Sequence, residues 1–344
     1  MTRLERLRPS LGEPLLVTAP ANVLYLVGFS SSNAALLVEP GGAQLFSDFR
    51  YAETGRAVPE AEFIETKRNL YADLAERLSG PIGFEADAVT FQQHETLAAQ
   101  GLELVPRRGL VEALRAVKDE DELETIRAAA AITSEAYTRL AEERFTGRSE
   151  RELAWRLDSL FHELGASGPA FETIVASGPN GARPHSRPTD RVLALGETVV
   201  IDAGAFLDGY CSDCTRTFAT GLLPEKLREG YAACLEGQLA GLDAVRAGVT
   251  GIDADAAARN SIEAAGFGEE FGHGLGHGVG LEVHEAPRLS RESPDTLAAG
   301  NVVTVEPGIY LPQLGGIRIE DLVIVGDGEP EILTTFTKDL VAVT

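Results

Sequence analysis

The chain has 344 residues, which at roughly 150 residues per domain predicts two domains. It carries 30 Lys and Arg residues against 53 Asp and Glu residues, and the net charge of −23 disfavours anionic partners, namely nucleic acid and acidic membrane surfaces. No run approaches the ~18 apolar residues of a membrane span, and residues 1–10 lack the apolar core of a signal peptide, so neither is expected.

In the first hundred-odd residues, short apolar runs alternate with helical patterns. Apolar runs bounded by turn residues predict strands at residues 15–18, 35–38, 44–46, 82–85 and 102–105. Apolar residues at helical spacing predict helices over residues 70–78 and after Thr90, where Thr90 and Gln93 have the spacing of a capping box. This alternation is typical of a small α/β domain with its own core.

The pattern changes near residue 116, so we place the domain boundary there and expect domains 1–116 and 117–344. A long amphipathic helix is expected from Asp119, and a second helix is expected from Ser149 to residue 164. Each of these two residues is followed three positions later by a glutamate that can complete a capping box.

Strand patterns dominate beyond residue 168. Residues 198–203 and 211–219 are predicted strands on either side of Asp208-Gly209, which is a strong signal for a two-residue hairpin turn. Helices are predicted over residues 226–245 and 253–265. The second domain is therefore predicted to be α+β.

Two acids of this hairpin are expected to lie near each other. With a two-residue turn, residues whose numbers sum to 417 face each other, so Asp202 lies opposite Thr215 and Asp213 is a diagonal neighbour, ~7–8 Å away on the same face. Two buried carboxylates at this separation repel unless a cation lies between them. The pair indicates a metal site, although pairing of one aspartate with Arg216 explains it equally well.

The segment 271–285 combines alternate glycines with three histidines. The glycines allow the backbone to pass close to another group, but their spacing is not that of a dinucleotide-binding loop. His273 and His277 have the spacing of a helical zinc pair, yet the glycine density disfavours a helix. Residues 281–284 alternate as in a strand and place His284 on its polar face. Taken singly, each histidine is better explained as a structural or surface residue.

Two further acids follow apolar runs: Glu306 comes after residues 302–305, and Glu320 lies between apolar residues of segment 316–325. Arg318 shares a strand face with Glu320, so an ion pair on an edge strand is an alternative explanation. Considered together, four carboxylates and one imidazole gather in the second domain: Asp202, Asp213, His277, Glu306 and Glu320. Their four negative charges balance the four positive charges of two divalent cations. Because most of the donors are oxygen atoms, Mn²⁺, Co²⁺ or Zn²⁺ is favoured. Two such ions can activate a water molecule against a carbonyl group, so the predicted chemistry is hydrolysis.

The three cysteines, Cys211, Cys214 and Cys234, are too few for a disulfide framework. Cys211 and Cys214 form a C-x-x-C motif, but no second pair completes a zinc site, and strand residues three apart point to opposite faces. A reducing, cytoplasmic location is therefore the simplest expectation.

Five segments of the second domain resemble the motifs of the pita-bread metallopeptidases, and among these the Xaa-Pro aminopeptidases and Xaa-Pro dipeptidases (prolidases). They are PHSRPTDR at 184–191, DAGAFLDGYCSDCTRT at 202–217, HGLGHGVGLEVHE at 273–285, VEPGIY at 305–310 and GIRIED at 316–321. Residues 22–29 and 47–51 are similar to the creatinase-like N-terminal domain of the same family. The resemblance covers essentially the whole chain.

The resemblance implies a pita-bread catalytic domain with two divalent ions, Mn²⁺ being expected ahead of Co²⁺ or Zn²⁺. The ligands it implies are Asp202, Asp213, His277, Glu306 and Glu320, of which Asp213 and Glu320 would bridge both ions.

Further roles follow from the same resemblance. Glu306 would accept the proton of the attacking water, His284 would contact the substrate near the scissile bond, and His185 would lie beside the proline. His273 would line the pocket, and Arg318 would support the ligands or the substrate. The substrates implied are peptides with proline at the second position, and the assembly implied is a homodimer whose first domain closes over the partner's site.

We expect a Xaa-Pro aminopeptidase, because the short first domain resembles that of the small bacterial aminopeptidases, and a Xaa-Pro dipeptidase is the alternative. A creatinase-like amidinohydrolase and a metal-free binding module are disfavoured because the five expected ligands are intact. A methionyl aminopeptidase is disfavoured because it normally lacks such a first domain.

Overall fold

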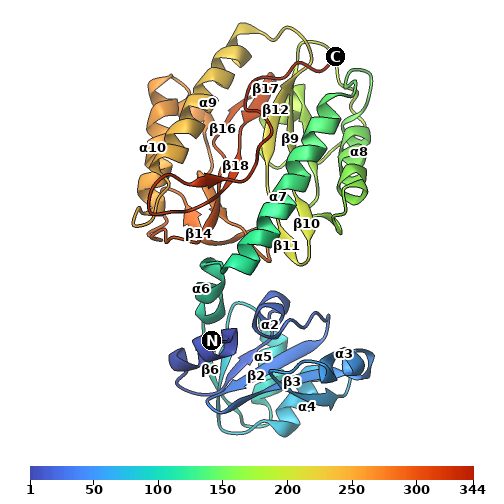
Figure 1. Cartoon of the computed structure of the whole chain (residues 1–344), viewed down its shortest axis with the longest axis vertical. Coiled ribbons are helices and arrows are strands. Elements are labelled where there is room, and N and C mark those ends of the chain that lie inside the picture. Colours follow the sequence, from blue (N-terminus) through green and yellow to red (C-terminus); the bar gives the residue numbers. More distant parts are fainter. The chain divides into compact units, whose positions relative to one another are not determined.

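The computed structural model describes residues 1–344 and contains two compact units, Met1–Arg115 and Ala116–Thr344 (Figure 1). The predicted fold class is confirmed: an α/β unit is followed by an α+β unit. No helix has the length and apolar character that crossing a membrane requires.

The first unit is built on one mixed sheet in the order β4-β3-β2-β1-β5-β6. Its β1, β2 and β3 are antiparallel neighbours, whereas β4, β5 and β6 each pair in parallel. The core between sheet and helices includes Leu16, Phe46, Leu74 and Leu97. The elements are α1 (Arg3–Leu7), η1 (Arg8–Ser10), β1 (Leu15–Val17), α2 (Pro20–Val27), β2 (Ala34–Glu39), β3 (Gly42–Asp48), η2 (Phe49–Tyr51), α3 (Ala52–Arg56), β4 (Glu62–Thr66), α4 (Leu70–Arg77), β5 (Pro81–Glu85), α5 (Phe91–Ala98), β6 (Glu103–Arg107) and α6 (Leu110–Ala116), where η marks a 3₁₀ helix.

The second unit contains four small sheets, in the orders β11-β10-β7, β12-β9-β8, β14-β13-β15-β18-β19 and β16-β17. Its elements are α7 (Glu120–Ala141), α8 (Glu150–Glu163), β7 (Gly168–Pro169), β8 (Ile174–Ser177), η3 (Gly178–Ala182), β9 (Thr198–Asp202), β10 (Ala205–Leu207), β11 (Tyr210–Cys211), β12 (Thr215–Ala219), α9 (Glu225–Ala244), α10 (Gly251–Ala264), η4 (Gly268–Glu270), β13 (Gly276–Gly278), β14 (Glu285–Leu289), β15 (Val302–Val305), β16 (Gly308–Leu311), β17 (Gly315–Arg318), β18 (Asp321–Ile324) and β19 (Glu331–Ile332).

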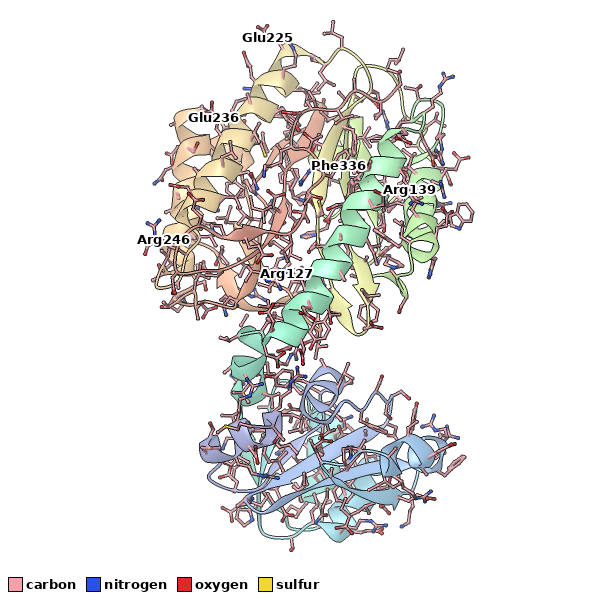
Figure 2. The ribbon with its side chains drawn as sticks, viewed as in Figure 1. Arg127, Arg139, Glu225, Glu236, Arg246 and Phe336 are labelled. Atoms are coloured by element: carbon pink, nitrogen blue, oxygen red, sulfur yellow. The ribbon has the colours of Figure 1, made fainter.

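The strands of this unit lie between two helix pairs, with α7 and α8 on one side and α9 and α10 on the other (Figure 1). Leu157 and Phe161 of α8 and Phe218 of β12 belong to the apolar core on the first side. Phe336 lies beside α7 (Figure 2), with its ring 5.8 Å from that of Tyr137. The buried Tyr137 hydroxyl lies 3.0 Å from the Ile201 oxygen and 2.8 Å from the Cys214 oxygen, so α7 contacts β9 and the residue just before β12.

The predicted helix starts are confirmed. Thr90, Asp119 and Ser149 each form a capping box, at the starts of α5, α7 and α8 respectively. The sequence patterns did not reveal α2 or β4.

Two strand predictions are wrong in part. Residues 211–219 do not form one strand, because β11 and β12 belong to different sheets and the chain between them is irregular. Residues 281–284 form a tight turn instead of a strand, since the Gly280 N–H donates to the Glu282 oxygen and the Glu282 N–H donates to the Glu285 carboxylate.

Candidate metal centre

The β-hairpin brings two of the five predicted ligands to one end of the sheet. The predicted register is confirmed: Asp202 faces Thr215 across β9 and β12, and the turn residues Asp208 and Gly209 both have positive φ, 48° and 91°. Asp202 ends β9, and Asp213 lies in the irregular segment between β11 and β12. Both side chains line one cavity of the second unit.

His277 reaches the same cavity from β13, where the backbone passes very close to its neighbour. A Cβ atom at Gly276 would lie 2.0 Å from the Thr304 main-chain oxygen, so only glycine fits there. The His277 Nδ1–H donates to the Gly278 oxygen over 3.1 Å, which leaves Nε2 to face the acids. Such a hydrogen bond on one ring nitrogen is the usual way to orient a metal-binding histidine.

Glu306 and Glu320 complete the group from the ends of β15 and β17. The Glu306 carboxylate lies 3.2 Å from His277 Nε2. Thr215 Oγ1 donates to one oxygen of the buried Glu320 carboxylate over 2.7 Å. Ligand atoms of Asp213, His277 and Glu320 all lie within 4.8 Å of one another, an arrangement that can hold a metal ion.

The donor set fits divalent cations, because the acids retain unused acceptors. One buried oxygen each of Asp202, Asp213 and Glu320 has no hydrogen-bond partner. Burial, followed by the charges of the neighbouring acids, raises the pKa of both Asp213 and Glu320 well above the usual range. Carboxylates that would be destabilised when ionised in this way are stabilised by a bound cation.

His277 and Glu306 form a charged pair in the protein alone. Burial opposes ionisation of both groups, but the contact between them raises the pKa of His277 and lowers the pKa of Glu306 to about 2. A metal ion binds neutral imidazole, so metal binding at His277 would displace the proton of this pair.

Arg318 does not pair with Glu320, contrary to the edge-strand alternative. It is buried on β17, where its Nη2 donates to Asp202 over 2.6 Å and its Nη1 donates to the Tyr310 hydroxyl over 2.9 Å. The strand ends at Arg318, which places Glu320 in the gap before β18 and on the metal side. Arg318 therefore orients one candidate ligand and neutralises part of its charge.

Arg216 pairs with neither Asp202 nor Asp213. Its guanidinium donates to Asp321 over 2.8 Å and also hydrogen-bonds the Glu320 main-chain oxygen. Asp321 further accepts from Lys338 and from other buried groups, so this network anchors the chain immediately beside Glu320.

The other predicted histidines also line the cavity. The His284 ring lies 4.3 Å from that of His277, and His273 contacts the Tyr310 hydroxyl over 3.0 Å. Burial lowers the pKa of both His273 and His284, which favours neutral rings. In neutral His273 the Nδ1–H donates to the Gly274 oxygen over 2.8 Å, so Nε2 accepts from Tyr310. His185 lies in the loop after η3.

The cavity has a volume of about 570 Å³, within the range of small-molecule sites. It combines the acids and histidines with apolar walls from Phe171, Ile174 and Val283. A second cavity of about 630 Å³ shares His273, Gly274 and Ser290 with it.

Sequence reasoning missed three supporting residues. Thr215 bonds Glu320, Thr304 contacts both His277 and Glu306, and Tyr310 contacts both His273 and Arg318. Tyr310 lies in the VEPGIY motif at 305–310, which could have indicated its place in the site.

Cys211 and Cys214 are buried and unpaired, and their sulfurs contact different carbonyl groups.

Comparisons with known proteins agree with this geometry. The sequence profile of metallopeptidase family M24 matches residues 124–327, and that of the creatinase/prolidase N-terminal domain matches residues 3–117. The "Uncharacterized peptidase YqhT" of Bacillus subtilis is 36% identical over 350 residues, which cover 98% of this chain and 99% of the relative.

Two solved structures share the fold over nearly the whole chain. A Xaa-Pro dipeptidase from Bacillus anthracis has a TM-score of 0.95 at 36% identity, covering 99% of both chains. An X-Pro aminopeptidase from Thermotoga maritima has a TM-score of 0.89 at 34% identity, covering 98% of this chain and 100% of its own.

The fold and the donor set define a hydrolase of the metallopeptidase class, with a creatinase-type first domain and a catalytic second domain. The chain belongs to metallopeptidase family M24, as the resemblance predicted, and this family uses a dinuclear metal centre.

Proposed function

We propose that the protein hydrolyses the peptide bond before a proline at the second position of its substrates, as a Xaa-Pro aminopeptidase. The observation that carries the proposal is the convergence of Asp202, Asp213, His277, Glu306 and Glu320 on one cavity with unused acceptor oxygens. These five residues would hold two divalent ions, with Mn²⁺ as the proposed metal because oxygen donors dominate the set.

Bound divalent ions would supply Lewis acidity, which polarises a carbonyl group and makes water a stronger acid. Glu306 is placed to accept a proton from water and pass it to the leaving amine, because its carboxylate faces the cavity beside the other candidate ligands. His284, as a neutral ring, can donate a hydrogen bond to a substrate oxygen, whereas the single N–H of neutral His273 is already used by the Gly274 main-chain oxygen. The acids also favour binding of the substrate's free ammonium group.

Room beyond a dipeptide supports the aminopeptidase assignment. The second cavity shares the lining residues His273, Gly274 and Ser290 with the first, and it would be the space into which a longer peptide continues past the proline.

A Xaa-Pro dipeptidase is the second candidate. It is supported by the name of the Bacillus anthracis structure and by Arg288 of β14, which lies opposite His277 of β13 and lines the cavity. The Arg288 guanidinium makes no hydrogen bond or ion pair within the chain, so it is available to bind the C-terminal carboxylate of a dipeptide.

The deciding assay compares Xaa-Pro dipeptides with Xaa-Pro-Yaa tripeptides on protein that has been stripped with chelator and reloaded with Mn²⁺, Co²⁺ or Zn²⁺. Cleavage of both classes, best with Mn²⁺ and absent in Asp213→Ala, is expected. Cleavage of dipeptides alone would select the second candidate, and full activity of the chelated protein or of Asp213→Ala would refute the proposal.

We further propose a cytoplasmic location, since three unpaired buried cysteines suit a reducing compartment. The family resemblance is the basis for also proposing a homodimer. Light scattering on the purified protein measures the oligomeric state directly, and a monomer would refute that part of the proposal.

A further inference from the structure

Pro184 and His185, in the segment between Ser177 and Thr189, line the cavity of the metal centre. Both ends of this segment form hydrogen bonds with one buried carboxylate. That carboxylate belongs to Glu150, the first residue of α8, which is 0% exposed. At one end of the segment, Ser177 donates to it from its main-chain N–H over 2.8 Å and from its hydroxyl over 2.9 Å.

The remaining contacts come from the middle and the far end of the segment. Asn180 Nδ2 lies 3.1 and 3.0 Å from the two Glu150 oxygens. The Thr189 N–H donates over 3.0 Å and its hydroxyl over 2.6 Å. Six donor contacts to one buried carboxylate hold the segment as a closed loop.

The charge of Glu150 is stabilised without an ion pair. The carboxylate lies at the N-terminus of α8, where the helix dipole favours negative charge, and its hydrogen bonds are charge-assisted. The main chain adds two links between the same elements: the Glu150 N–H donates to the Arg191 oxygen and the Arg151 N–H donates to the Thr189 oxygen.

The opposite side of the segment packs against β17. A Cβ atom at Gly316 would lie 1.9 Å from the Gly181 oxygen, so the two backbones are in direct contact. Arg318, the last residue of β17, donates to the Pro184 oxygen over 3.2 Å and to Asp202 over 2.6 Å. The segment therefore lies between Glu150 and a strand that also reaches the metal centre, and a shift of the segment moves His185 relative to the ligands.

We propose that Glu150 is a positioning residue that holds the substrate-binding segment 177–189 in register with the metal centre. This inference rests on the proposed function only for the identity of the substrate. Glutamine cannot replace Glu150, because its amide NH₂ would face the N–H and O–H donors of the segment. A misplacement of about 1 Å at a reacting site can cost about 100-fold in rate, so a 10- to 100-fold loss of kcat/KM is expected for Glu150→Gln.

The test compares Glu150→Gln with Glu152→Gln in the full-length, metal-loaded protein. Glu152 lies on the same helical turn, its carboxylate forms hydrogen bonds with Ser149 alone, and glutamine can also complete that capping box. Hydrogen exchange of residues 177–189 is the readout that does not depend on catalysis. We expect exchange at least tenfold faster in Glu150→Gln, with unchanged metal content, and no such change in Glu152→Gln.

A double-mutant cycle with His185→Ala separates positioning from general damage. If Glu150 acts through the segment that carries His185, Glu150→Gln/His185→Ala loses no more kcat/KM than the worse single variant. Unchanged exchange in Glu150→Gln, or losses that multiply in the double variant, would overturn the inference. A wild-type protein that does not cleave Xaa-Pro peptides would refute the proposed function instead, and the exchange measurement would still decide the role of Glu150.

Thr189→Val provides a second variant if Glu150→Gln does not fold. It removes, at nearly constant volume, the hydroxyl that donates to Glu150 and accepts from Asn180 and from the Arg191 N–H. We therefore expect at least threefold faster exchange of the segment and a loss of kcat/KM that does not add to that of His185→Ala. Exchange equal to that of the wild type in Thr189→Val would overturn the inference.

Discussion

Substitution of Asp213 by asparagine should make the metal-free protein more stable than the wild type and the metal-loaded protein less stable than the wild type. Ligand atoms of Asp213 and Glu320 lie within 4.8 Å of each other, and at an effective dielectric constant near 20 two unit charges at this distance repel by about 3.5 kcal/mol. Proton uptake relieves part of this cost, because the pKa of both acids is raised. Asp213→Asn should therefore stabilise the metal-free protein by about 1–3 kcal/mol.

Metal binding changes the comparison. Each site occupied at a metal concentration 100 times its Kd stabilises the folded protein by about 2.7 kcal/mol, and two occupied sites give about twice that value. For a domain of this size, 1 kcal/mol corresponds to about 2–4 °C in Tm. Wild type should thus gain about 10–20 °C when Mn²⁺ is added, and Asp213→Asn should gain much less.

The assay is thermal unfolding in chelator and in excess Mn²⁺. Asp208→Asn is the matched control, since it makes the same change at an exposed turn of the same hairpin and should respond to Mn²⁺ as the wild type does. The reasoning would be refuted if Asp213→Asn were less stable than wild type in chelator, or if Mn²⁺ raised the Tm of both equally.

Three further predictions follow from single contacts. Arg216→Met should lower the free energy of unfolding by about 3–5 kcal/mol, because it leaves Asp321 buried without its main partner. The control Arg139→Met removes an exposed pair and should change the free energy of unfolding by less than about 0.5 kcal/mol. Urea unfolding measures both variants, and equal losses would contradict the prediction. Gly276→Ala should reduce metal content and activity together, because the new Cβ meets a main-chain oxygen at 2.0 Å; elemental analysis showing full metal content would count against it. Arg288→Met should raise KM about tenfold for Xaa-Pro dipeptides and much less for tripeptides in steady-state kinetics, and an equal rise for both would remove Arg288 from carboxylate recognition.

Local patterns predicted a large part of the structure. Capping boxes located the starts of α5, α7 and α8, because the residues that cap a helix are neighbours in sequence. The turn at Asp208-Gly209 fixed the pairing of Asp202 with Thr215 several residues away, because antiparallel register follows from turn length.

The remaining features depend on contacts between distant segments. Strand periodicity paired Arg318 with Glu320, but Arg318 binds Asp202, more than a hundred residues away, and periodicity carries no information about such a partner. No sequence pattern singled out Glu150, because its partners Ser177 and Thr189 lie 27 and 39 residues away along the chain.

Metal stoichiometry tests the central claim most directly. Chelator-treated protein is dialysed against Mn²⁺ and its bound metal is determined by elemental analysis, with Xaa-Pro hydrolysis measured on the same samples. The account predicts two ions per chain in the wild type, activity that returns as the ions bind, and a loss of both in Glu320→Gln. Binding of no ion by the wild type, or full hydrolysis by the metal-free protein, would contradict it.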